Sequence, residues 1–528
     1  MTRVEDLQTR LQDPGFTPGR RDVPGLLELL GLADDDEPVL RALARLGAEA
    51  KAPVVARFDG AAAPLRARLV RLYGRLAREH PEDDAWRWLE GRLDDGDPKA
   101  RRNALIALKH GPPTPEREAL LLGYWSREAR PEHRRTVADA LGALGGQRSV
   151  ALLEAWRGDD PQLQKIITRT LLRLRRDARR GAGSSLHPER RSRGQFTARL
   201  WHRAGLERVT EAFLPKGWRR AGHRGPGALA VTLEGSLTDL LAVRTARWFG
   251  VELTPVALSP REELADTVAR VLASEEARKV FSTWTAGVPR VRIAVGQGGH
   301  PRKLLWAIAE RLEKLTRSVV NDPRESTWEA VVSEYRGTLQ VVLSPHAMAD
   351  PRFPWRLAQV PASSHPTVAA ALALVAGVRP GEVVWDPFVG AGAELVERSL
   401  LGPWTRMVGT DRDPTALEAA RTNLQAAGVE GVALLQQDAR DTQVEGLTLA
   451  LTNPPLGSRV GFGEEVPALL EAMVPRIARQ LRPGGRLVWL SPVPERTRAA
   501  AQRAGLRVTW DQPVSLEGLV TALQRFDR

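Results

Sequence analysis

Apolar residues recur with helical spacing through the first third of the chain, in stretches that each open at a proline. The stretches are PVLRALARLG, PLRARLVRLYG, PKARRNALIALKHG, PEHRRTVADALGALG and PQLQKIITRTLLRLRR, which begin at Pro38, Pro64, Pro98, Pro131 and Pro161. Proline is favoured in the first turn of a helix, where its missing N–H has no partner in any case. After a first step of 26 residues, the prolines are 34, 33 and 30 residues apart. This period predicts a solenoid of stacked helical pairs over residues 1–180.

Two of these helices have a predicted cap. Asp97 and Asp160 directly precede Pro98 and Pro161, and an aspartate in that position accepts hydrogen bonds from the first free N–H groups of a helix. The segment resembles short HEAT-like repeats. Solenoids of this kind mainly bind or scaffold other molecules. We therefore assign no chemistry to this segment and consider a protein partner on its surface.

The pattern changes after the last repeat. Residues 179–194, RRGAGSSLHPERRSRG, have no apolar period and collect Gly, Ser, Pro and Arg, which is typical of a linker. We place a basic linker at residues 181–194. Residues 195–348 then mix two periods: ALAVTL and RVRIAV indicate strands, ELADTVARVLA and PRKLLWAIAERLEKLT indicate helices, and TWEAVVSEY with TLQVVLSP indicates a strand pair. This mixture predicts an α+β module with antiparallel sheets.

Short apolar strands alternate with helical segments in the last part, residues 349–528. The strands are EVVWD, RMVGTD, VALLQQD, LTLALTN and GRLVWLSP. Such alternation is the signature of a doubly wound α/β domain. The expected fold is therefore multidomain, with an N-terminal α-solenoid, a central α+β module and a C-terminal α/β Rossmann-like domain.

Composition narrows the classes of function. The chain has no Cys, so disulfides, thiolate metal ligands and cysteine nucleophiles are excluded. Its nine His are scattered without ligand spacing, so we expect no metal site. The first residues lack the apolar stretch of a signal peptide, and no apolar run reaches the roughly 18 residues of a membrane span. We expect a cytoplasmic protein with no membrane segment.

The net charge of +13 is concentrated in one part of the chain. Residues 165–224 hold 17 basic and four acidic residues, an excess equal to that of the whole chain. A block of this kind fits an electrostatic footprint for phosphates. The alternative is a solvated linker whose arginines repel one another.

Polar residues and glycines stand where four consecutive predicted strands end. They are Asp386 with Gly390 and Gly392 in the turn after it, Asp411, Asp438, and Asn453 at the start of TNPPLG. The glycines let the backbone approach a ligand closely. A carboxylate at Asp386 would repel a pyrophosphate but pair with a cation, and an acid at Asp411 suits a ribose diol. A capping aspartate or an Asn-Pro turn is the alternative for each residue alone, but the ordered set lines one crevice.

These motifs resemble those of class I S-adenosylmethionine-dependent methyltransferases. NPPL resembles the (Asp/Asn)-Pro-Pro-aromatic motif of enzymes that methylate exocyclic or amide nitrogens. The wider pattern of WRLAQVPASSHPTVAAALALVAGVRPGEVVWDPFVGAGAELVE, NPPLGSRVG and LRPGGRLVWLSP is similar to the THUMP-associated RNA guanine-N2 methyltransferases. RVRIAV and ESTWEAVVSEYRGTLQVVLSP look like a THUMP domain with its ferredoxin-like part, so the resemblance covers roughly residues 190–528.

The resemblance implies a role for each motif residue. S-adenosyl-L-methionine would be the cofactor, with Asp411 on the ribose and Asp438 on the adenine. The remaining contacts to it would come from Asp386, Phe388, Gly390, Gly392 and Asn453. The catalytic motif would be Asn453, Pro454, Pro455 and Leu456, in which the Asn453 side-chain oxygen and the Pro454 carbonyl accept hydrogen bonds from the target amino group.

Leu456 departs from the family motif, which has an aromatic residue that stacks on the flipped-out base. Stacking is worth roughly 1–3 kcal/mol per base. Leu456 therefore indicates weaker base binding, a different target or lost activity. Phe388 or Phe462 is an alternative aromatic surface, and ordinary core packing is the alternative for both.

RNA contacts are expected at two basic segments. Arg190, Arg191 and Arg193 belong to the basic block, and GQGGHPRK ends with Arg302 and Lys303 where a helix begins. The latter segment could grip a phosphate or be a plain turn.

The function implied is methylation of structured RNA, forming N2-methylguanosine in tRNA or rRNA. One alternative is a protein amide or amine N-methyltransferase, because glutamine methylation uses a similar Asn-Pro-Pro motif. The other is a catalytically degenerate scaffold that binds RNA or protein. The THUMP-like segment and the basic block favour RNA, whereas Leu456 and the repeats favour the scaffold.

Overall fold

The computed structural model divides the chain into two compact units, Met1–Ala182 and Gly183–Arg528. It describes every residue except 1–2, 14–15, 33–34, 181–182, 260–261, 297–300, 362, 457–464 and 517. In the part described, no helix is long and apolar enough to cross a membrane. The expected finer division at residues 180, 194 and 348 stays a prediction.

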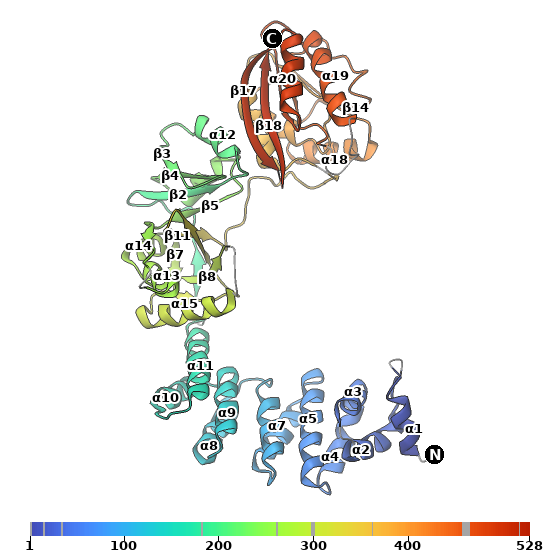
Figure 1. Ribbon diagram of the computed structural model, residues 1–528, viewed down its shortest axis with the longest axis vertical. Helices are drawn as coiled ribbons and strands as arrows, with labels where there is room; N and C mark the ends of the chain where they lie inside the picture. Colours follow the sequence, from blue (N-terminus) through green and yellow to red (C-terminus); the bar gives the residue numbers. More distant parts are fainter. Residues whose placement is uncertain are drawn as a thin grey trace. The chain divides into compact units, whose positions relative to one another are not determined.

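Unit 1 is built from helices that follow one another in sequence order (Figure 1). Each of the five prolines opens a helix, as predicted: α3 (Glu37–Arg45), α5 (Ala63–Glu79), α7 (Pro98–Leu108), α9 (Pro131–Leu144) and α11 (Pro161–Arg180). The other helices are α1 (Arg3–Arg10), α2 (Val23–Leu32), α4 (Lys51–Phe58), α6 (Asp83–Glu90), α8 (Pro115–Arg127) and α10 (Gln147–Ala155), with short 3-10 turns at Arg20–Asp22, Gly47–Ala50 and Gly91–Asp94. Neighbouring members of the proline series pack on one another, α5 on α7, α7 on α9 and α9 on α11. One continuous apolar core runs through the unit.

Both predicted caps are confirmed. The Asp97 carboxylate accepts a hydrogen bond from the Ala100 N–H at 3.0 Å. Asp160 accepts from the N–H groups of Gln162 and Leu163 at 3.0 and 3.1 Å. These bonds satisfy N–H groups that no helical carbonyl can reach, so each cap helps to fix where its helix begins.

Arginines join successive repeats of unit 1. Near the start of a proline-led helix, an arginine pairs with an acid that precedes the next such helix. The pairs and their N···O distances are Arg66–Asp95 (3.1 Å), Arg101–Glu128 (3.5 Å) and Arg135–Asp160 (2.8 Å). The high arginine content of this unit is therefore partly neutralised by ion pairs between repeats.

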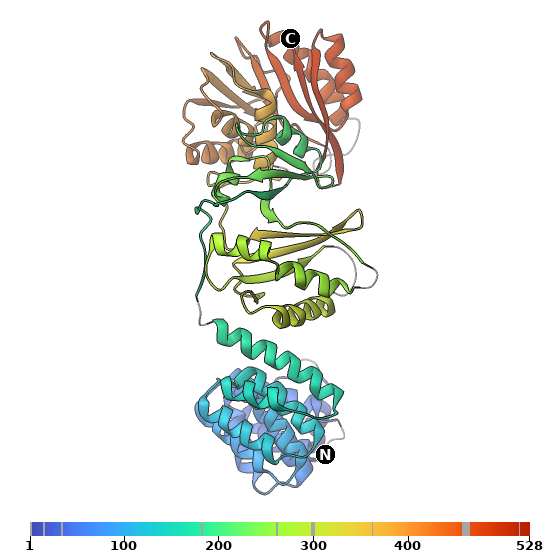
Figure 2. The same cartoon turned by 90° about the vertical axis from the view of Figure 1, so that its left-hand side faces the viewer.

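Unit 2 contains a nine-stranded sheet in its first half, with strand order β3-β4-β2-β5-β11-β10-β8-β9 and β6 added on β11. The strands are β2 (Phe196–Trp201), β3 (Arg220–His223), β4 (Ala228–Leu233), β5 (Trp248–Glu252), β6 (Val256–Ala257), β8 (Arg290–Val295), β9 (Val320–Asn321), β10 (Trp328–Tyr335) and β11 (Thr338–Pro345). The helices are α12 (Leu206–Ala212), α13 (Leu264–Leu272), α14 (Glu275–Trp284) and α15 (Pro301–Leu315), with a 3-10 turn at Leu237–Ala242. Helices α13 and α15 pack on each other and share one core with the strands (Figure 2).

The expectation of antiparallel sheets is wrong for part of this sheet. The strand pair β10–β11 is antiparallel as predicted, but β8 pairs in parallel with both β10 and β9. Helix α15 lies between β8 and β9 along the chain. A parallel pair needs a crossover connection of this length, and the helix supplies it.

The segment expected to be a linker is bonded to unit 2 over most of its length. Strand β1 (Ser184–Leu186) pairs with β7 (Thr285–Gly287). Further on, the Trp284 indole N–H donates to the Arg190 carbonyl at 2.8 Å, and the Ser192 N–H donates to the Gly235 carbonyl at 2.8 Å. A strand of three residues is too short to show an apolar period, so the sequence pattern gives no sign of this pairing.

The C-terminal domain has a seven-stranded sheet with strand order β14-β13-β12-β15-β16-β18-β17. All five predicted strands are present, as β12 (Val383–Asp386), β13 (Arg406–Asp411), β14 (Val432–Gln436), β15 (Leu449–Thr452) and β16 (Arg486–Ser491), and they pair in parallel. A hairpin of β17 (Arg507–Leu516) and β18 (Leu519–Asp527) completes the sheet, with β18 antiparallel to β16. Along the chain the order reverses between β12 and β15, and a ligand crevice is expected where it does.

Helices cover both faces of this sheet. Helices α16 (Pro366–Ala376), α17 (Ala393–Ser399) and α18 (Pro414–Ala426) share one apolar cluster with the strands, and α19 (Glu465–Gln480) and α20 (Pro494–Arg503) share another. Val384 and Trp385 are neighbours in β12 but belong to different clusters, because successive side chains of a strand point to opposite faces. The predicted doubly wound fold is thus present.

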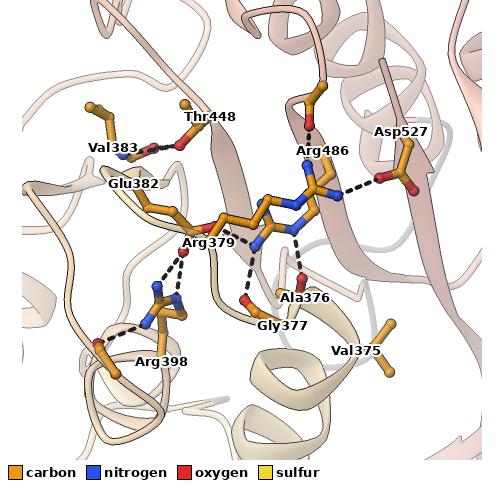
Figure 3. A network of polar contacts seen from close by, with 12 residues as sticks. Val375, Ala376, Gly377, Arg379, Glu382, Val383, Arg398, Thr448, Arg486 and Asp527 are labelled. Carbon is orange, nitrogen blue, oxygen red and sulfur yellow. Dashed lines mark hydrogen bonds and ion pairs between the residues drawn. The ribbon is translucent and has the colours of Figure 1, made fainter.

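A buried ion-pair network holds the amino end of β12 (Figure 3). Glu382 pairs with Arg398 of α17 and with Arg486 of β16, and all three side chains are at most 1% exposed. The Arg486 guanidinium also donates to the carbonyls of Ala376 and Gly377 at 2.6 and 2.8 Å. Among the described residues, the Arg486 Nη1 is the one nitrogen of this guanidinium that is buried without a hydrogen-bond partner. The network ties the first strand to a helix on one side and to the fifth strand on the other.

Candidate active site

The predicted site residues lie at the opposite, carboxyl ends of the strands. Asp386 and Asp411 are the last residues of β12 and β13, and Asn453 directly follows β15. Asp438 lies two residues beyond β14. Because these four strands are parallel neighbours in one sheet, their carboxyl ends lie along one edge.

The turn from β12 into α17 depends on its two glycines. Gly390 and Gly392 have φ angles of 49° and 83°, a left-handed conformation that residues with a Cβ rarely adopt. A Cβ at Gly392 would lie 3.4 Å from the Ala420 Cα, so the turn also passes close to α18. The Gly390 N–H donates to Asp411 Oδ2 at 3.0 Å, which joins this turn to the end of the next strand.

The carboxylate of Asp411 is held by backbone donors. Its Oδ2 binds the Gly390 N–H, and its Oδ1 accepts from the Asp413 N–H at 3.0 Å. The side chain is half-buried. Each carboxylate oxygen has more than one lone pair, so Asp411 keeps the capacity to accept from a diol.

Asp438 has a cation of its own. Arg440 donates to both of its oxygens, Nε to Oδ1 at 3.0 Å and Nη2 to Oδ2 at 2.7 Å. The Arg440 hydrogen bonds lower the pKa of Asp438 to about 2, with the charge of Arg440 adding to the effect. Asp438 is therefore an anion at neutral pH, and an adenine amino group bound there would share it with Arg440.

Asp386 is fully buried and only partly satisfied. Its Oδ1 accepts from the Phe388 N–H at 3.1 Å. Its Oδ2 is buried and forms no hydrogen bond of normal length among the described residues, although the Thr452 hydroxyl is near enough to lower the pKa of Asp386 as a donor. Burial raises the pKa of Asp386 well above its usual range, and the charge of nearby Glu394 adds to this. A buried carboxyl oxygen without a close donor is rare in proteins, and it suits a cationic or hydrogen-bond-donating ligand.

Asn453 has a similar unpaired oxygen. Its Nδ2 donates to the Ser364 Oγ at 2.8 Å, and its Oδ1 is buried without a partner in the part of the chain that the structure describes. Pro454 beside it is buried and Pro455 is half-buried. The arrangement offers a free amide oxygen at the end of β15.

Leu456 and Phe388 both pack against apolar clusters. Half-buried Leu456 contacts the cluster of α16, α17 and α18, and Phe388 contacts the cluster of α19 and α20. For Phe388, packing in the core is the alternative to serving as an aromatic surface that stacks on the target base. Gly457 and Phe462 lie outside the described residues.

Two further residues of the site, Ser364 and Glu394, were missed by sequence reasoning. Ser364 Oγ donates to Glu394 Oε1 at 2.5 Å, and Glu394 is 3% exposed. Burial raises the pKa of Glu394 to about 7, against the opposing hydrogen bond from Ser364. The available signal was a carboxylate at the second residue of α17, directly after the glycine turn. Ser364 carries no motif, and it is 89 residues from Asn453.

The basic residues predicted to bind RNA lie on the surface. Arg190, Arg191 and Arg193 are exposed, as are Arg302 and Lys303 at the start of α15. His300 lies outside the described residues.

Part of the basic block is internal rather than exposed. Arg199 is buried and pairs with Glu252 at 3.1 Å, and Arg224 pairs with the same carboxylate at 2.7 Å. The sequence count of positive charge therefore overstates the positive surface of this segment.

Family models match two segments of the chain. Residues 354–522 match a family described as RMKL-like, methyltransferase domain, and residues 87–171 match HEAT repeats. These matches confirm the resemblance of the C-terminal domain to methyltransferases and of the N-terminal helices to HEAT repeats.

The chain is also similar to curated and solved proteins. It is 33% identical over 134 residues to a tRNA (guanine(10)-N2)-dimethyltransferase of Methanothermobacter thermautotrophicus, covering 25% of this chain and 39% of that protein. It is 32% identical over 127 residues to the U6 snRNA (guanine-N(2))-methyltransferase THUMPD2 of Bos taurus, covering 24% of this chain and 25% of that protein. The chain thus spans well under half the length of these relatives.

One solved structure supports the fold. The crystal structure of TrmN from Thermus thermophilus superimposes with a TM-score of 0.50 at 21% identity, covering 63% of this chain and all of that one. At this identity the likeness shows the fold alone.

Proposed function

We propose that this protein is an S-adenosylmethionine-dependent RNA methyltransferase that forms N2-methylguanosine in tRNA or rRNA. The observation that carries the proposal is the buried Oδ1 of Asn453, which has no partner among the described residues and stands at the end of β15 in a domain that matches a methyltransferase family. The guanine-N2 specificity named for both relatives supports the choice of target atom.

The residues present fit this cofactor. S-adenosylmethionine carries a sulfonium and an ammonium, and Asp386 offers a buried carboxyl oxygen with no close donor among the described residues. Gly390 and Gly392 allow a close backbone approach. We assign these three residues and Phe388 to the methionine part, Asp411 to the ribose and Asp438 to the adenine. When bound, the cofactor supplies an electrophilic methyl group.

The protein's part in the reaction is to prepare the nucleophile. The exocyclic amine of guanine is a weak nucleophile because its lone pair is delocalised into the ring. Asn453 Oδ1 and the Pro454 carbonyl accept its two N–H groups, which favours a pyramidal nitrogen with a free lone pair. The same contacts hold the nitrogen in line for transfer. No strong base is required before the methyl group moves.

Leu456 changes how the base is held. The side chain packs on the core cluster of the domain, and an aliphatic side chain offers a base less contact than an aromatic ring does. We propose that the Pro454–Pro455 backbone and the RNA-binding surface of unit 2 supply the base positioning that stacking provides elsewhere. This leaves transfer intact while lowering the affinity for an isolated nucleoside.

RNA capture is assigned to the central α+β region. Its exposed cations Arg190, Arg191, Arg193, Arg302 and Lys303 can contact phosphates, and such contacts position RNA without reading its sequence. We interpret this region as THUMP-like, in keeping with the name of the Bos taurus relative. A cytoplasmic location and a protein partner on the repeats stay predictions.

A test that separates the candidate functions is methyl transfer from radiolabelled S-adenosylmethionine into total RNA and into total protein, followed by nucleoside analysis. We expect label in RNA that co-migrates with N2-methylguanosine, and a rate of labelling about 10²–10³-fold lower with the Asn453→Ala variant. Label in protein would favour the amide or amine N-methyltransferase. Binding of RNA without transfer by the intact protein would favour the degenerate scaffold, which Leu456 otherwise supports.

A further inference from the structure

A chain of two hydrogen bonds joins a buried carboxylate to the amide of Asn453. Asn453 Nδ2 donates to Ser364 Oγ at 2.8 Å, and Ser364 Oγ donates to Glu394 Oε1 at 2.5 Å. The three residues come from different segments: Ser364 lies just before α16, Glu394 is in α17 and Asn453 follows β15. These bonds end at Asn453 Oδ1, which has no partner in the part of the chain that the structure describes.

The order of donors along this chain is dictated by the carboxylate. An ionised carboxylate can only accept, and a serine hydroxyl has one hydrogen. That hydrogen goes to Glu394, so the Ser364 oxygen can only accept from Asn453. The amide must then present its NH₂ to Ser364 and its oxygen to the other side.

We propose that Glu394 is a positioning residue that acts through Ser364 to turn the Asn453 amide oxygen toward the target amine. The inference rests on the proposed function and deepens it. It explains why the N–H groups of the target amine meet the oxygen of the Asn453 amide and not its NH₂. Without Glu394 the Ser364 hydrogen is free to donate to Asn453 Oδ1. The amide can then rotate and face the target amine with its own NH₂, and two donors repel.

Protonation of Glu394 should have the same effect. A neutral carboxyl can donate its proton to Ser364, which reverses the order of donors along the chain. The charged groups that face Glu394 are Asp386 at the end of β12 and Glu397 one turn along α17, and Arg244 binds Glu397 through both of its oxygens at 2.7 and 2.8 Å. No cation pairs with Glu394 itself among the described residues, and burial raises its pKa to about 7.

The test compares single-turnover methyl transfer by the full chain and its variants. Glu394→Leu should lower the rate at saturating RNA and cofactor by about 10²-fold, with a smaller change in the KM for RNA. Ser364→Ala should lower it by about tenfold, because the amide loses its anchor but gains no opposing donor. Ser363→Ala is the matched control, since among the described residues the Ser363 hydroxyl bonds to the Val360 backbone alone, and it should stay within about twofold. Circular dichroism and thermal unfolding confirm that each variant is folded.

A pH profile separates positioning from mere structure. The wild-type rate should fall on the acid side as Glu394 gains its proton, because burial raises the pKa of this carboxyl above its usual range. Glu394→Gln keeps a hydrogen-bonding partner for Ser364, so it should retain more activity than Glu394→Leu and lose the acid limb. Equal rates for Ser364→Ala and Ser363→Ala, or an unchanged acid limb in Glu394→Gln, would overturn the proposal.

An NMR measurement that does not depend on catalysis tests the inference separately from the proposed function. The Asn453 side-chain NH₂ pair, assigned in nitrogen-15 NMR spectra by its loss in Asn453→Asp, should shift with the same apparent pKa in the wild type and not in Ser364→Ala. If the wild type methylates no RNA, the proposed function fails and this titration decides the inference. A wild-type amide pair that does not respond to pH would overturn the inference even in an active enzyme.

Discussion

The two ends of strand β12 both carry buried carboxylates, but only one end supplies them with cations. At the amino end, Glu382 is bound by Arg398 and Arg486 (Figure 3). At the carboxyl end, Asp386 has an oxygen without a partner among the described residues, and Glu394 has a serine. The same strand therefore begins beside a carboxylate that is paired with two arginines. It ends at a carboxyl group that has no cation as a partner among the described residues.

The difference indicates what each end does. Burying a charge costs free energy unless a partner replaces water, and at the amino end the arginines provide one. At the carboxyl end the partners are hydrogen-bond donors, the Phe388 N–H for Asp386 and the Ser364 hydroxyl for Glu394. No cation pairs with either carboxylate among the described residues, and burial raises the pKa of both. Groups left in this condition cluster at functional sites. The amino end fixes the fold, and the carboxyl end is where we propose that the ligands bind.

The largest expected effect is at the amino end. Glu382→Ala leaves two buried arginines without their anion, so it should lower the free energy of unfolding of unit 2 by about 3–5 kcal/mol. Glu418→Ala in the exposed pair with Arg421 is the control and should change it by no more than about 0.5 kcal/mol. Urea unfolding measures both. A small loss in Glu382→Ala would remove the distinction between the two ends.

At the carboxyl end, activity should change more than stability. Asn453→Ala removes the acceptor for the target amine and should lower the rate of methyl transfer by about 10²–10³-fold, while cofactor affinity stays nearly unchanged. Isothermal titration with S-adenosylmethionine and a radiolabel assay measure the two effects. Retained transfer would take Asn453 out of the mechanism.

The stability of unit 2 should depend on pH through Glu394. Its pKa is raised from 4.5 to about 7 in the folded chain, so the folded state binds the proton more tightly than the unfolded state does. The resulting stabilisation is fully present below pH 4.5 and is lost as the pH rises through about 7. The free energy of unfolding should therefore fall more steeply over this window in the wild type than in Glu394→Gln. Parallel curves would show that Glu394 does not titrate there.

The smallest expected effect is on RNA binding, through three arginines that are far in sequence from both ends of strand β12. Reversing the charge of Arg190, Arg191 and Arg193 together should weaken RNA binding and flatten its salt dependence, by roughly 0.7 to 0.9 in the logarithmic slope for each phosphate that the variant no longer neutralises. Filter binding over a range of salt concentrations measures the slope. An unchanged slope would mean that these arginines do not contact RNA. The contrast between the two ends of β12 does not depend on this result.

Much of the fold was predictable because its signals are local. A proline at the start of a helix and an aspartate before it are adjacent in sequence, and all five proline-led helices begin where expected. The five parallel strands of the last domain are equally local, as short apolar runs that end in polar residues. The positions of Asp386, Asp411, Asp438 and Asn453 at one edge of the sheet follow from the strands being parallel.

What could not be predicted depends on contacts between distant segments. The pairing of β1 with β7 joins residues about a hundred positions apart, and its three-residue strands leave no period to detect. The parallel pairing of β8 was hidden for a related reason, since strand patterns do not show direction. At the site, Ser364 and Glu394 belong to no motif, and only the folded chain brings them to Asn453.

The arginine pairs between repeats of unit 1 bear on how that unit loses its structure. An array of repeats unfolds as one body only while each repeat is coupled to the next, and Arg66–Asp95, Arg101–Glu128 and Arg135–Asp160 supply part of that coupling as charge. Salt weakens such pairs where water reaches them. The cooperativity of this solenoid is therefore itself a function of ionic strength, and concentrated salt should broaden its melting transition before it lowers the midpoint.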